Sequence, residues 1–428
     1  MLKNKILNNA KWIIACKVVQ SLLQLVIGML CARYLGPSNY GVINYAASIV
    51  GLAMPIVQLG LNATLVQELI DAPEQEGKIM GTSLIMDFVS GASCIMLVGA
   101  FVGVANRDES VTIIVCILYS IALIFKAFEL FQYWFQYKLL SKYPSVVMVF
   151  SYIIVSAYRV FLLVTSKSIY WFAVVNALDY AIIGIAMFVI YNRLSKNWLC
   201  FSFDVARRLF AKSKYYILSS MMVTVFQNTD HIMLKNISGN AQNGFYTAAV
   251  TASVVLQFVY TAIVDSMRPV ILECKKSDEE DYKRNISRLY CATIYLSLAQ
   301  GVAFTVFAKH IIWLLYGAEY LASVGVLRIA VWGMMFSCMG AVRNIWILAE
   351  GKYKMLWKIN LAGAMCNVAI NAVLIPLYGA FGAAVATLLT QALTNFVLGF
   401  IIKPLRENNR LLIEGLNPKL LLCIFKKN

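Results

Sequence analysis

Apolar runs long enough to cross a lipid bilayer recur along the whole chain, and they restrict its fold more than any other feature. A helix needs about twenty apolar residues to span the hydrocarbon core of a membrane. Runs of roughly eighteen or more such residues follow one another, separated by short polar breaks. Only 14% of the residues are charged, whereas soluble domains have about a quarter. The sequence therefore predicts an all-α polytopic membrane protein.

Charged residues and Gly or Pro clusters divide these runs into twelve predicted transmembrane helices. The predicted spans are residues 12–34, 40–61, 80–104, 111–131, 146–165, 169–191, 214–235, 244–266, 288–308, 322–349, 355–376 and 379–402. The first span follows a basic N-terminus, and the next span begins directly after it. We therefore expect the first helix to remain in the protein rather than to serve as a cleaved signal.

The distribution of Lys and Arg predicts the orientation of the spans, because cytoplasmic loops of membrane proteins retain these residues. With both termini inside, the inner segments hold 27 of the 37 Lys and Arg residues, the outer segments hold five, and five lie within spans. The same distribution accounts for the net charge of +16. Anionic lipid of the inner leaflet is the expected partner of this charge, and nucleic-acid binding is not needed to explain it.

An internal repeat relates the two halves of the chain at an offset of 203 residues. The aligned identities are Gln24 with Gln227, Gly36 with Gly239, Gly41 with Gly244, and Ala46 with Ala249. Each half then contains six predicted spans, an even number, so both halves enter the membrane from the same side. The repeat predicts two pseudo-symmetric six-helix lobes around a central cleft, at residues 1–200 and 201–403, with a basic linker at 192–214 and a cytoplasmic tail at 404–428.

Polar residues follow one helical face in the first spans of each half. Lys17, Ser21, Gln24 and Gly28 are spaced as on one face of a helix, and Gln227 and His231 occupy matching positions in the second half. The next span continues the pattern with Asn44 and Gln58. Small polar residues often only join membrane helices. A charge needs water or a partner, so Lys17, Asp230 and His231 favour a water-filled cavity.

Ionisable residues inside the spans are the other candidates for function, because a charge at the centre of a bilayer helix costs about 2.5–3.5 kcal/mol on insertion scales. Asp230 and His231 are candidates for ion coupling, and Asp87 is a further candidate ion or proton carrier. Arg159 lies deep in its span, with Asp179 as its candidate partner. Arg343 lies within two turns of a helix end, where either snorkelling or a place in the cavity explains it.

Two further charged pairs have the spacing of structural ion pairs. Lys126 and Glu129 are three residues apart, and so are Asp265 and Arg268. Motifs for several other function classes are missing from the sequence. It contains no phosphate-binding GK[ST] loop and no HExxH zinc motif, and neither His has neighbours at metal-ligand spacing. The predicted outer loops are too short to hold the acceptor and carboxylates of a typical membrane polymerase or glycosyltransferase. An enzyme is therefore the weaker alternative to a transporter.

Two stretches carry a family resemblance. The segment "ARYLGPSNYGVINYAASIVGLAMPIVQLGL", which begins at Ala32, and the segment "DHIMLKNISGNAQNGFYTAAV", which begins at Asp230, resemble the polysaccharide-transport branch of the multidrug/oligosaccharidyl-lipid/polysaccharide exporter superfamily. The similarity runs from about residue 11 to residue 403 and is carried by loose motifs. Phe245 stands between Gly244 and Tyr246, which is a small departure from the pattern.

The resemblance implies a MATE-like pair of six-helix lobes and the activity of an O-antigen-type flippase in the bacterial plasma membrane. It implies an undecaprenyl-pyrophosphate-linked oligosaccharide as substrate, a proton or sodium gradient as driving force with no bound cofactor, and the polysaccharide polymerase machinery as a partner. A pyrophosphate needs cations and sugars need amides. The candidate substrate-cavity residues are therefore Lys17, Gln24, Asn44, Gln58, Arg159, Gln227 and Arg343. A drug exporter of the same superfamily, which would prefer an acidic cavity, and a cell-wall lipid-precursor flippase remain alternatives.

Overall fold

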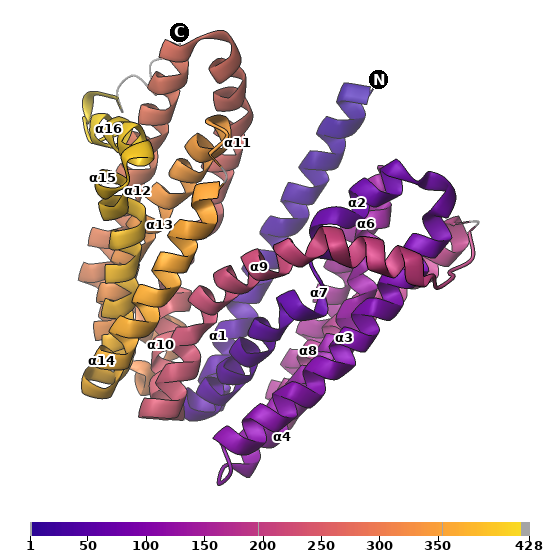
Figure 1. Cartoon of the computed structure of the whole chain (residues 1–428). Helices are drawn as coiled ribbons and strands as arrows, with labels where there is room; N and C mark the ends of the chain where they lie inside the picture. Colours follow the sequence, from indigo (N-terminus) through magenta and orange to yellow (C-terminus); the bar gives the residue numbers. More distant parts are fainter. Residues whose placement is uncertain (1, 196, 353, 421–428) are drawn as a thin grey trace. The chain divides into compact units, whose positions relative to one another are not determined.

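The structure, a computed structural model, describes residues 2–195, 197–352 and 354–420; of the side chains in these ranges, those of residues 2–23, 63, 219 and 354 fall outside the description. Within these ranges the regular secondary structure is entirely helical (Figure 1). The chain forms two compact units. Unit 1 contains the chain up to Leu35 together with Val42–Asn228, and unit 2 contains Gly36–Gly41 together with Thr229–Asn428.

Unit 1 is built from eight helices and two short 3₁₀ turns together with the first part of a ninth helix. They are α1 (Leu2–Val57), α2 (Leu61–Asp71), η1 (Pro73–Gln75), α3 (Glu76–Ala105), α4 (Ser110–Ser120), α5 (Ala122–Lys126), η2 (Ala127–Leu130), α6 (Phe131–Tyr137), α7 (Lys142–Val164), α8 (Ile169–Leu194) and the first part of α9 (Phe203–Ser238). A core of apolar and aromatic side chains joins α2, α3, α6 and α8 with the start of α9, and includes Leu65, Phe131, Trp134 and Leu209.

Unit 2 contains the rest of α9 and the remaining helices. They are α10 (Asn240–Ser253), α11 (Gln257–Ser277), α12 (Glu279–Tyr316), η3 (Ala318–Tyr320), α13 (Ser323–Ala349), α14 (Lys354–Ala392), the π-helical turn η4 (Leu393–Val397), α15 (Leu398–Ile401), η5 (Lys403–Leu405) and α16 (Arg406–Gly415). The core of this unit includes Tyr290 of α12, Trp346 of α13 and Leu412 of α16. Of the predicted tail, α16 is therefore a packed helix.

Eight helical stretches in the described residues are long and apolar enough to span a membrane, or nine if the bent pair α10 and α11 counts as one span. The predicted all-α multi-pass architecture is confirmed, whereas the number twelve stays a prediction. The predicted span 214–235 lies in α9, which is not among the eight. The basic residues near its start and the polar run from Gln227 to His231 lower its hydropathy.

Two of the eight stretches cover two predicted spans each, because a glycine interrupts the helix. A straight helix of 47 residues, the length of Met355–Ile401, would be about 70 Å long, more than twice the hydrocarbon thickness of a bilayer. Gly379 breaks this stretch with φ 55° and ψ −131°. Gly36 breaks α1 in the same manner, with φ 69° and ψ 171°. The break at Gly36 lies between two predicted spans, and the break at Gly379 lies at the first residue of the last predicted span.

The division between the units falls inside α9, between Asn228 and Thr229. Only residues 195–202 of the predicted basic linker are non-helical among the described positions, because α9 already begins at Phe203. The start of α9 packs on unit 1, where the backbone carbonyl of Ser213 fills the space beside Gly60 that a side chain would need. The predicted lobe limits at residues 200 and 201 follow the repeat, and they stay a prediction.

The turn Gly36–Gly41 belongs to unit 2, although both flanking stretches of α1 belong to unit 1. It packs against the start of α10. A Cβ atom on Gly41 would overlap the backbone carbonyl of Asn240, and a Cβ atom on Gly244 would overlap the backbone carbonyl of Pro37. Only glycine permits so close an approach of two backbones. These glycines therefore position the turn on α10.

Candidate functional site

Asp230 is the centre of a buried hydrogen-bond cluster in unit 2. Its side chain is 4% exposed, and it lies in α9, sixteen residues after Lys214, the last basic residue at the start of that helix. The Tyr246 hydroxyl of α10 donates to Oδ2 at 2.6 Å, and the Asn371 amide of α14 donates to Oδ1 at 2.5 Å. The Thr387 hydroxyl also donates to Oδ2. Three donors from two other helices therefore stabilise a carboxylate at this position.

The two halves of α14 both contribute to this cluster because the break at Gly379 separates Asn371 from Thr387. Asn371 also donates to Asn367 Oδ1 at 3.0 Å, one turn earlier. Both asparagine side chains are fully buried. Asn371 Oδ1 and Asn367 Nδ2 have no hydrogen-bond partner within the described part of the chain. The cluster therefore has spare acceptor and donor capacity next to a carboxylate.

His231 belongs to a second set of contacts beside this cluster. Its Nδ1 atom lies 2.8 Å from Asn243 Oδ1 and 3.3 Å from the Thr247 hydroxyl, both of α10. The Asn243 amide group donates to the Gly41 carbonyl at 2.8 Å. Asn243 therefore connects His231, the neighbour of Asp230, to the turn Gly36–Gly41.

The structure places the other predicted site residues in both units. Lys17, Gln24, Asn44, Gln58, Asp87, Arg159 and Gln227 belong to unit 1, whereas Arg343 belongs to unit 2 with Asp230 and His231. The side chain of Lys17 lies outside the described residues. Gln24 and Gln227, which the repeat relates, are both exposed, and Asn44 and Gln58 are half-buried. Their places in a substrate cavity stay predictions.

Arg343 is buried, with 5% of its side chain exposed. Its Nη1 atom donates to the Thr394 carbonyl at 2.6 Å, inside the π-helical turn η4. A π-helical turn leaves carbonyl groups without their usual helical donors, and the guanidinium group supplies one. Of the two sequence interpretations, snorkelling does not describe a side chain that is this deeply buried.

Arg159 and Asp179 are neighbours in unit 1. Asp179 Oδ1 accepts a hydrogen bond from the Ser151 hydroxyl at 2.8 Å, and the Arg159 guanidinium acts on it electrostatically. The two predicted structural ion pairs are confirmed. Lys126 Nζ lies 2.5 Å from Glu129 Oε2, and Arg268 Nη2 lies 3.3 Å from Asp265 Oδ1.

Two buried glutamates in unit 1 were not singled out from the sequence. Glu76 accepts hydrogen bonds from Trp134 Nε1 at 2.7 Å and from Ser195 Oγ at 3.3 Å, and it pairs with Lys138 Nζ at 2.8 Å. Burial alone would lower the pKa of Lys138, but the hydrogen bond and the charge of Glu76 raise it above its ordinary value. The Lys138 ammonium therefore stays charged.

Glu68, at the end of α2, pairs with two cations of α9. Arg208 Nε lies 3.2 Å from its Oε2 atom, and Lys212 Nζ is also paired with its carboxylate. The Glu68 side chain is 3% exposed, whereas those of Arg208 and Lys212 are 38% and 51% exposed. These contacts hold the start of α9 on unit 1.

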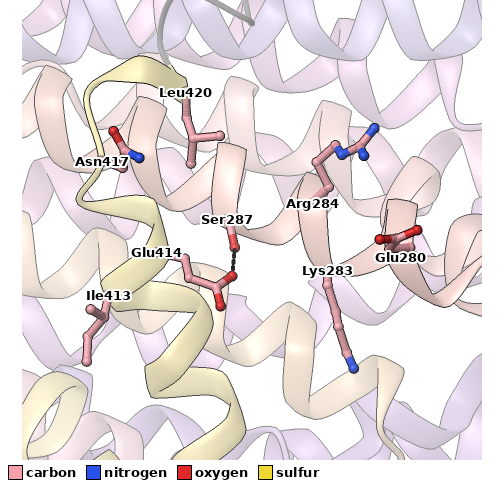
Figure 2. Close-up of a pocket in the computed structure, with 8 residues that line it drawn as sticks. All are labelled: Glu280, Lys283, Arg284, Ser287, Ile413, Glu414, Asn417 and Leu420. Carbon is pink, nitrogen blue, oxygen red and sulfur yellow. Dashed lines mark hydrogen bonds between the residues drawn. The ribbon is translucent and has the colours of Figure 1, made fainter.

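A pocket of about 610 Å³ lies between α12 and α16 in unit 2 (Figure 2). Its charged residues have partners nearby, since Lys283 pairs with Glu279 and Glu407 at 3.4 Å. Ser287 donates to Glu414 at 3.5 Å across the pocket. None of the predicted site residues lines it. No group of three or more His, Cys, Asp or Glu side chains with the geometry to hold a metal ion occurs in the described ranges.

Comparison with known proteins identifies the family. The model of a family described as polysaccharide biosynthesis protein matches residues 6–275, which is more than half of the chain. The chain belongs to this polysaccharide biosynthesis protein family. The resemblance inferred from the two sequence stretches is thereby confirmed. Both stretches, and with them Asp230, lie within the matched residues.

Two relatives match this chain over nearly their whole length. A Shigella flexneri protein with the name "Putative O-antigen transporter" is 22% identical over 402 residues, which are 89% of this chain and 94% of that protein. The capsular polysaccharide biosynthesis protein CapF of Staphylococcus aureus is 22% identical over 394 residues, which are 90% of this chain and 96% of that protein.

Solved structures show the fold that this family member adopts. The lipid II flippase MurJ in an inward closed conformation matches with a TM-score of 0.73 at 16% identity, over 97% of this chain and 93% of that one. An inward-facing multidrug resistance transporter of the MATE family matches with a TM-score of 0.68 at 12% identity, over 91% of this chain and 94% of that one. The predicted MATE-like fold is confirmed.

Proposed function

We propose that this polysaccharide biosynthesis protein is a flippase for lipid-linked oligosaccharides. It moves a polyprenyl-pyrophosphate-linked repeat unit from the inner to the outer leaflet by alternating access. The observation that carries the proposal is the combination of this family with a fold shared by a lipid II flippase. The relative named "Putative O-antigen transporter" supports the same function. The chain acts as a transporter, and its substrate leaves chemically unchanged.

The substrate class follows from the chemistry that the residues offer. A pyrophosphate binds cations in a partly dehydrated site. Arg159 is half-buried in unit 1, and Lys17 is the other cation on the predicted polar face. Exposed amides such as Gln24 and Gln227 suit sugar hydroxyls. The proposed membrane is the bacterial plasma membrane, with both termini on the cytoplasmic side. The polymerase machinery that consumes the outer-leaflet product is the proposed partner.

Asp230 is the proposed coupling group for a monovalent cation, either a proton or sodium. Its carboxylate accepts hydrogen bonds from α10 and from both halves of α14. A bound cation takes over part of the charge that these donors stabilise, so cation binding changes how tightly the three segments are held together. Such a change biases a two-state transporter toward one of its conformations.

A complementation experiment tests the flippase. The gene is deleted in its host, and surface polysaccharide is analysed on gels after restoration with wild type, Lys17→Ala or Asp230→Asn. We expect wild type to restore long-chain polysaccharide and both variants to fail, with lipid-linked repeat units accumulating on the cytoplasmic side. Unchanged polysaccharide in the deletion strain, together with new sensitivity to cationic dyes, would instead establish a drug exporter.

Reconstituted vesicles test the coupling role separately. Flipping of a lipid-linked oligosaccharide is measured under a proton gradient, a sodium gradient or neither. Wild type is expected to respond to one gradient, and Asp230→Asn to neither. Asp265→Asn is the matched control, because this carboxylate is 55% exposed and forms its ion pair with Arg268, three residues later on the same helix. Gradient-driven flipping by Asp230→Asn at the wild-type rate would rule out coupling through Asp230.

A further inference from the structure

A buried aspartate, remote in sequence from Asp230, lies in unit 1. Asp87 occupies the middle of α3 and is 5% exposed. Its Oδ1 atom has no hydrogen-bond partner among the residues that the structure describes. An ionised carboxylate in such surroundings is unfavourable by several kcal/mol unless a cation or hydrogen-bond donors compensate. The local charge balance therefore decides whether Asp87 carries a proton.

Lys126 is the cation that acts on Asp87, but its charge is already compensated. Lys126 Nζ lies 2.5 Å from Glu129 Oε2, and it also lies 4.8 Å from the centre of the Tyr180 ring. The 3₁₀ turn η2 follows Lys126 directly, and in such a turn side chains three residues apart lie on the same side. The carboxylates of Asp87 and Glu129 thus share the one ammonium group of Lys126. With both carboxylates ionised, the three groups carry one negative charge in excess, and binding of one proton neutralises it.

No other neighbouring element offers Asp87 a free cation in the described ranges. Helix α4, which packs on α3, has no charged residue. Tyr133 of α6 interacts with Asp87, Lys126 and Glu129 but carries no positive charge. On α8, Asp179 is a further acid. The charged groups of α2 and of the start of α3 are Glu68, Asp71, Glu76 and Lys78. Glu68 and Glu76 are each paired with cations of their own, and Asp71 and Lys78 are exposed, with Lys78 nine residues before Asp87 on the same helix.

Two glycines hold the Lys126–Glu129 segment close to its neighbours. A Cβ atom on Gly91 of α3 would lie 2.8 Å from the Leu123 carbonyl, and a Cβ atom on Gly184 of α8 would lie 2.6 Å from Phe128 Cβ. At these two positions α3 and α8 therefore approach the segment formed by α5 and η2 more closely than a residue with a side chain would permit. Asp87, one turn before Gly91, is held beside this segment.

We propose that Asp87 is a proton-binding site in unit 1, separate from Asp230. Lys126 controls the protonation of Asp87 by forming an ion pair either with Glu129 or with Asp87. With Lys126 on Glu129, Asp87 holds the proton. When Lys126 moves to Asp87, the proton leaves Asp87 for Glu129, which is the more exposed acid at 17%. The number of protons and the total charge stay the same in this exchange. The site does not depend on the identity of the transported substrate.

Infrared difference spectroscopy of the purified full-length protein in lipid nanodiscs tests the site without any transport assay. The signal is the carbonyl stretch of a protonated carboxyl group, recorded against pH in H₂O and D₂O. At neutral pH we expect one protonated carboxyl band that is lost in Asp87→Asn. It should persist in Asp230→Asn and in Asp71→Asn, whose carboxylate is exposed.

Glu129→Gln provides a second variant that leaves Asp87 in place. Removing the Glu129 charge frees Lys126 to pair with Asp87, so the band at neutral pH should be lost and should return only in more acidic buffer. A wild-type spectrum without the band at neutral pH, or a band unchanged in Asp87→Asn, would overturn the site. A band unchanged in Glu129→Gln would overturn the control by Lys126. Both results are independent of flippase activity, so they separate this proposal from the function proposed above.

Discussion

Gly41 and Gly244 occupy repeat-related positions and pack against each other's neighbours in a reciprocal way. The space beside Gly41 is filled by the carbonyl of Asn240, and the space beside Gly244 is filled by the carbonyl of Pro37. Asn240 and Pro37 are themselves related by the offset of 203 residues. The contact between the turn Gly36–Gly41 and the start of α10 is therefore locally two-fold symmetric.

Gly244→Ala should destabilise the protein by about 1–3 kcal/mol, because the added methyl group overlaps backbone atoms that cannot rotate away. The measurement is the thermal unfolding midpoint in detergent. Gly103→Ala is the control, since Gly103 lies in α3 with nothing within 4 Å of a Cβ atom. That variant should be neutral or slightly more stable. Equal midpoints for both variants would contradict the close approach.

Gly36→Ala and Gly239→Ala should each cost about 1–3 kcal/mol through the backbone alone. Both glycines have positive φ with extended ψ, at 69° and 171° for Gly36 and at 91° and 174° for Gly239, a region that is essentially restricted to glycine. Nothing lies within 4 Å of a Cβ atom on Gly239, so a steric clash contributes nothing there. A Gly239→Ala variant as stable as wild type would show that the backbone conformation is different.

Thr387→Val should lower gradient-driven flipping about tenfold or more, because it removes a hydrogen bond to the Asp230 carboxylate while keeping the shape. Hydrogen bonds to charged groups are worth about 1.5–3 kcal/mol. Thr390→Val, one turn later, loses only a bond to its own helix at Ala386 and should retain activity. Vesicle flipping rates with and without the gradient check both variants, and equal losses would point to general damage to α14.

Glu68→Gln should lower stability by about 1 kcal/mol, because both cations that it pairs with are partly exposed and recover water. The difference from wild type should shrink as salt is added, since salt screens such pairs. Unfolding midpoints at low and high salt provide the measurement. Asp71→Asn, at the exposed end of the same helix, serves as the reference and should show neither effect.

The sequence indicates Asp230 because a charge inside an apolar run is costly, and that signal needs no knowledge of the fold. Its partners Asn371 and Thr387 carry no such signal, since single amides and hydroxyls are common in membrane helices. The four-residue spacing of Asn367 and Asn371, which places both amides on one face of a helix, was the available sequence signal for a polar contact there. Their contact with Asp230 depends on the break of α14 at Gly379 and on the packing of both halves of α14 against α9, which are properties of the tertiary structure.

The ion pairs show the same limit. Lys126 and Glu129 are near in sequence, so their spacing predicts the contact. Glu68 meets Lys212 across 144 residues, and no local pattern reveals it. The helices themselves were predictable from their apolar runs. The division of α1 between the two units was not predictable, because it depends on glycines that allow two backbones to come into contact.

The placement of Gly36–Gly41 in unit 2 has a consequence for synthesis of the chain. No single cut yields two fragments that each contain one whole unit, since unit 2 includes a turn from within the sequence of unit 1. During translation this turn leaves the ribosome about 200 residues ahead of Asn240, a delay of roughly 10–40 s at ordinary elongation rates. The first two predicted spans are therefore synthesised well before α10, and during this delay the turn Gly36–Gly41 lacks its contact with the start of α10.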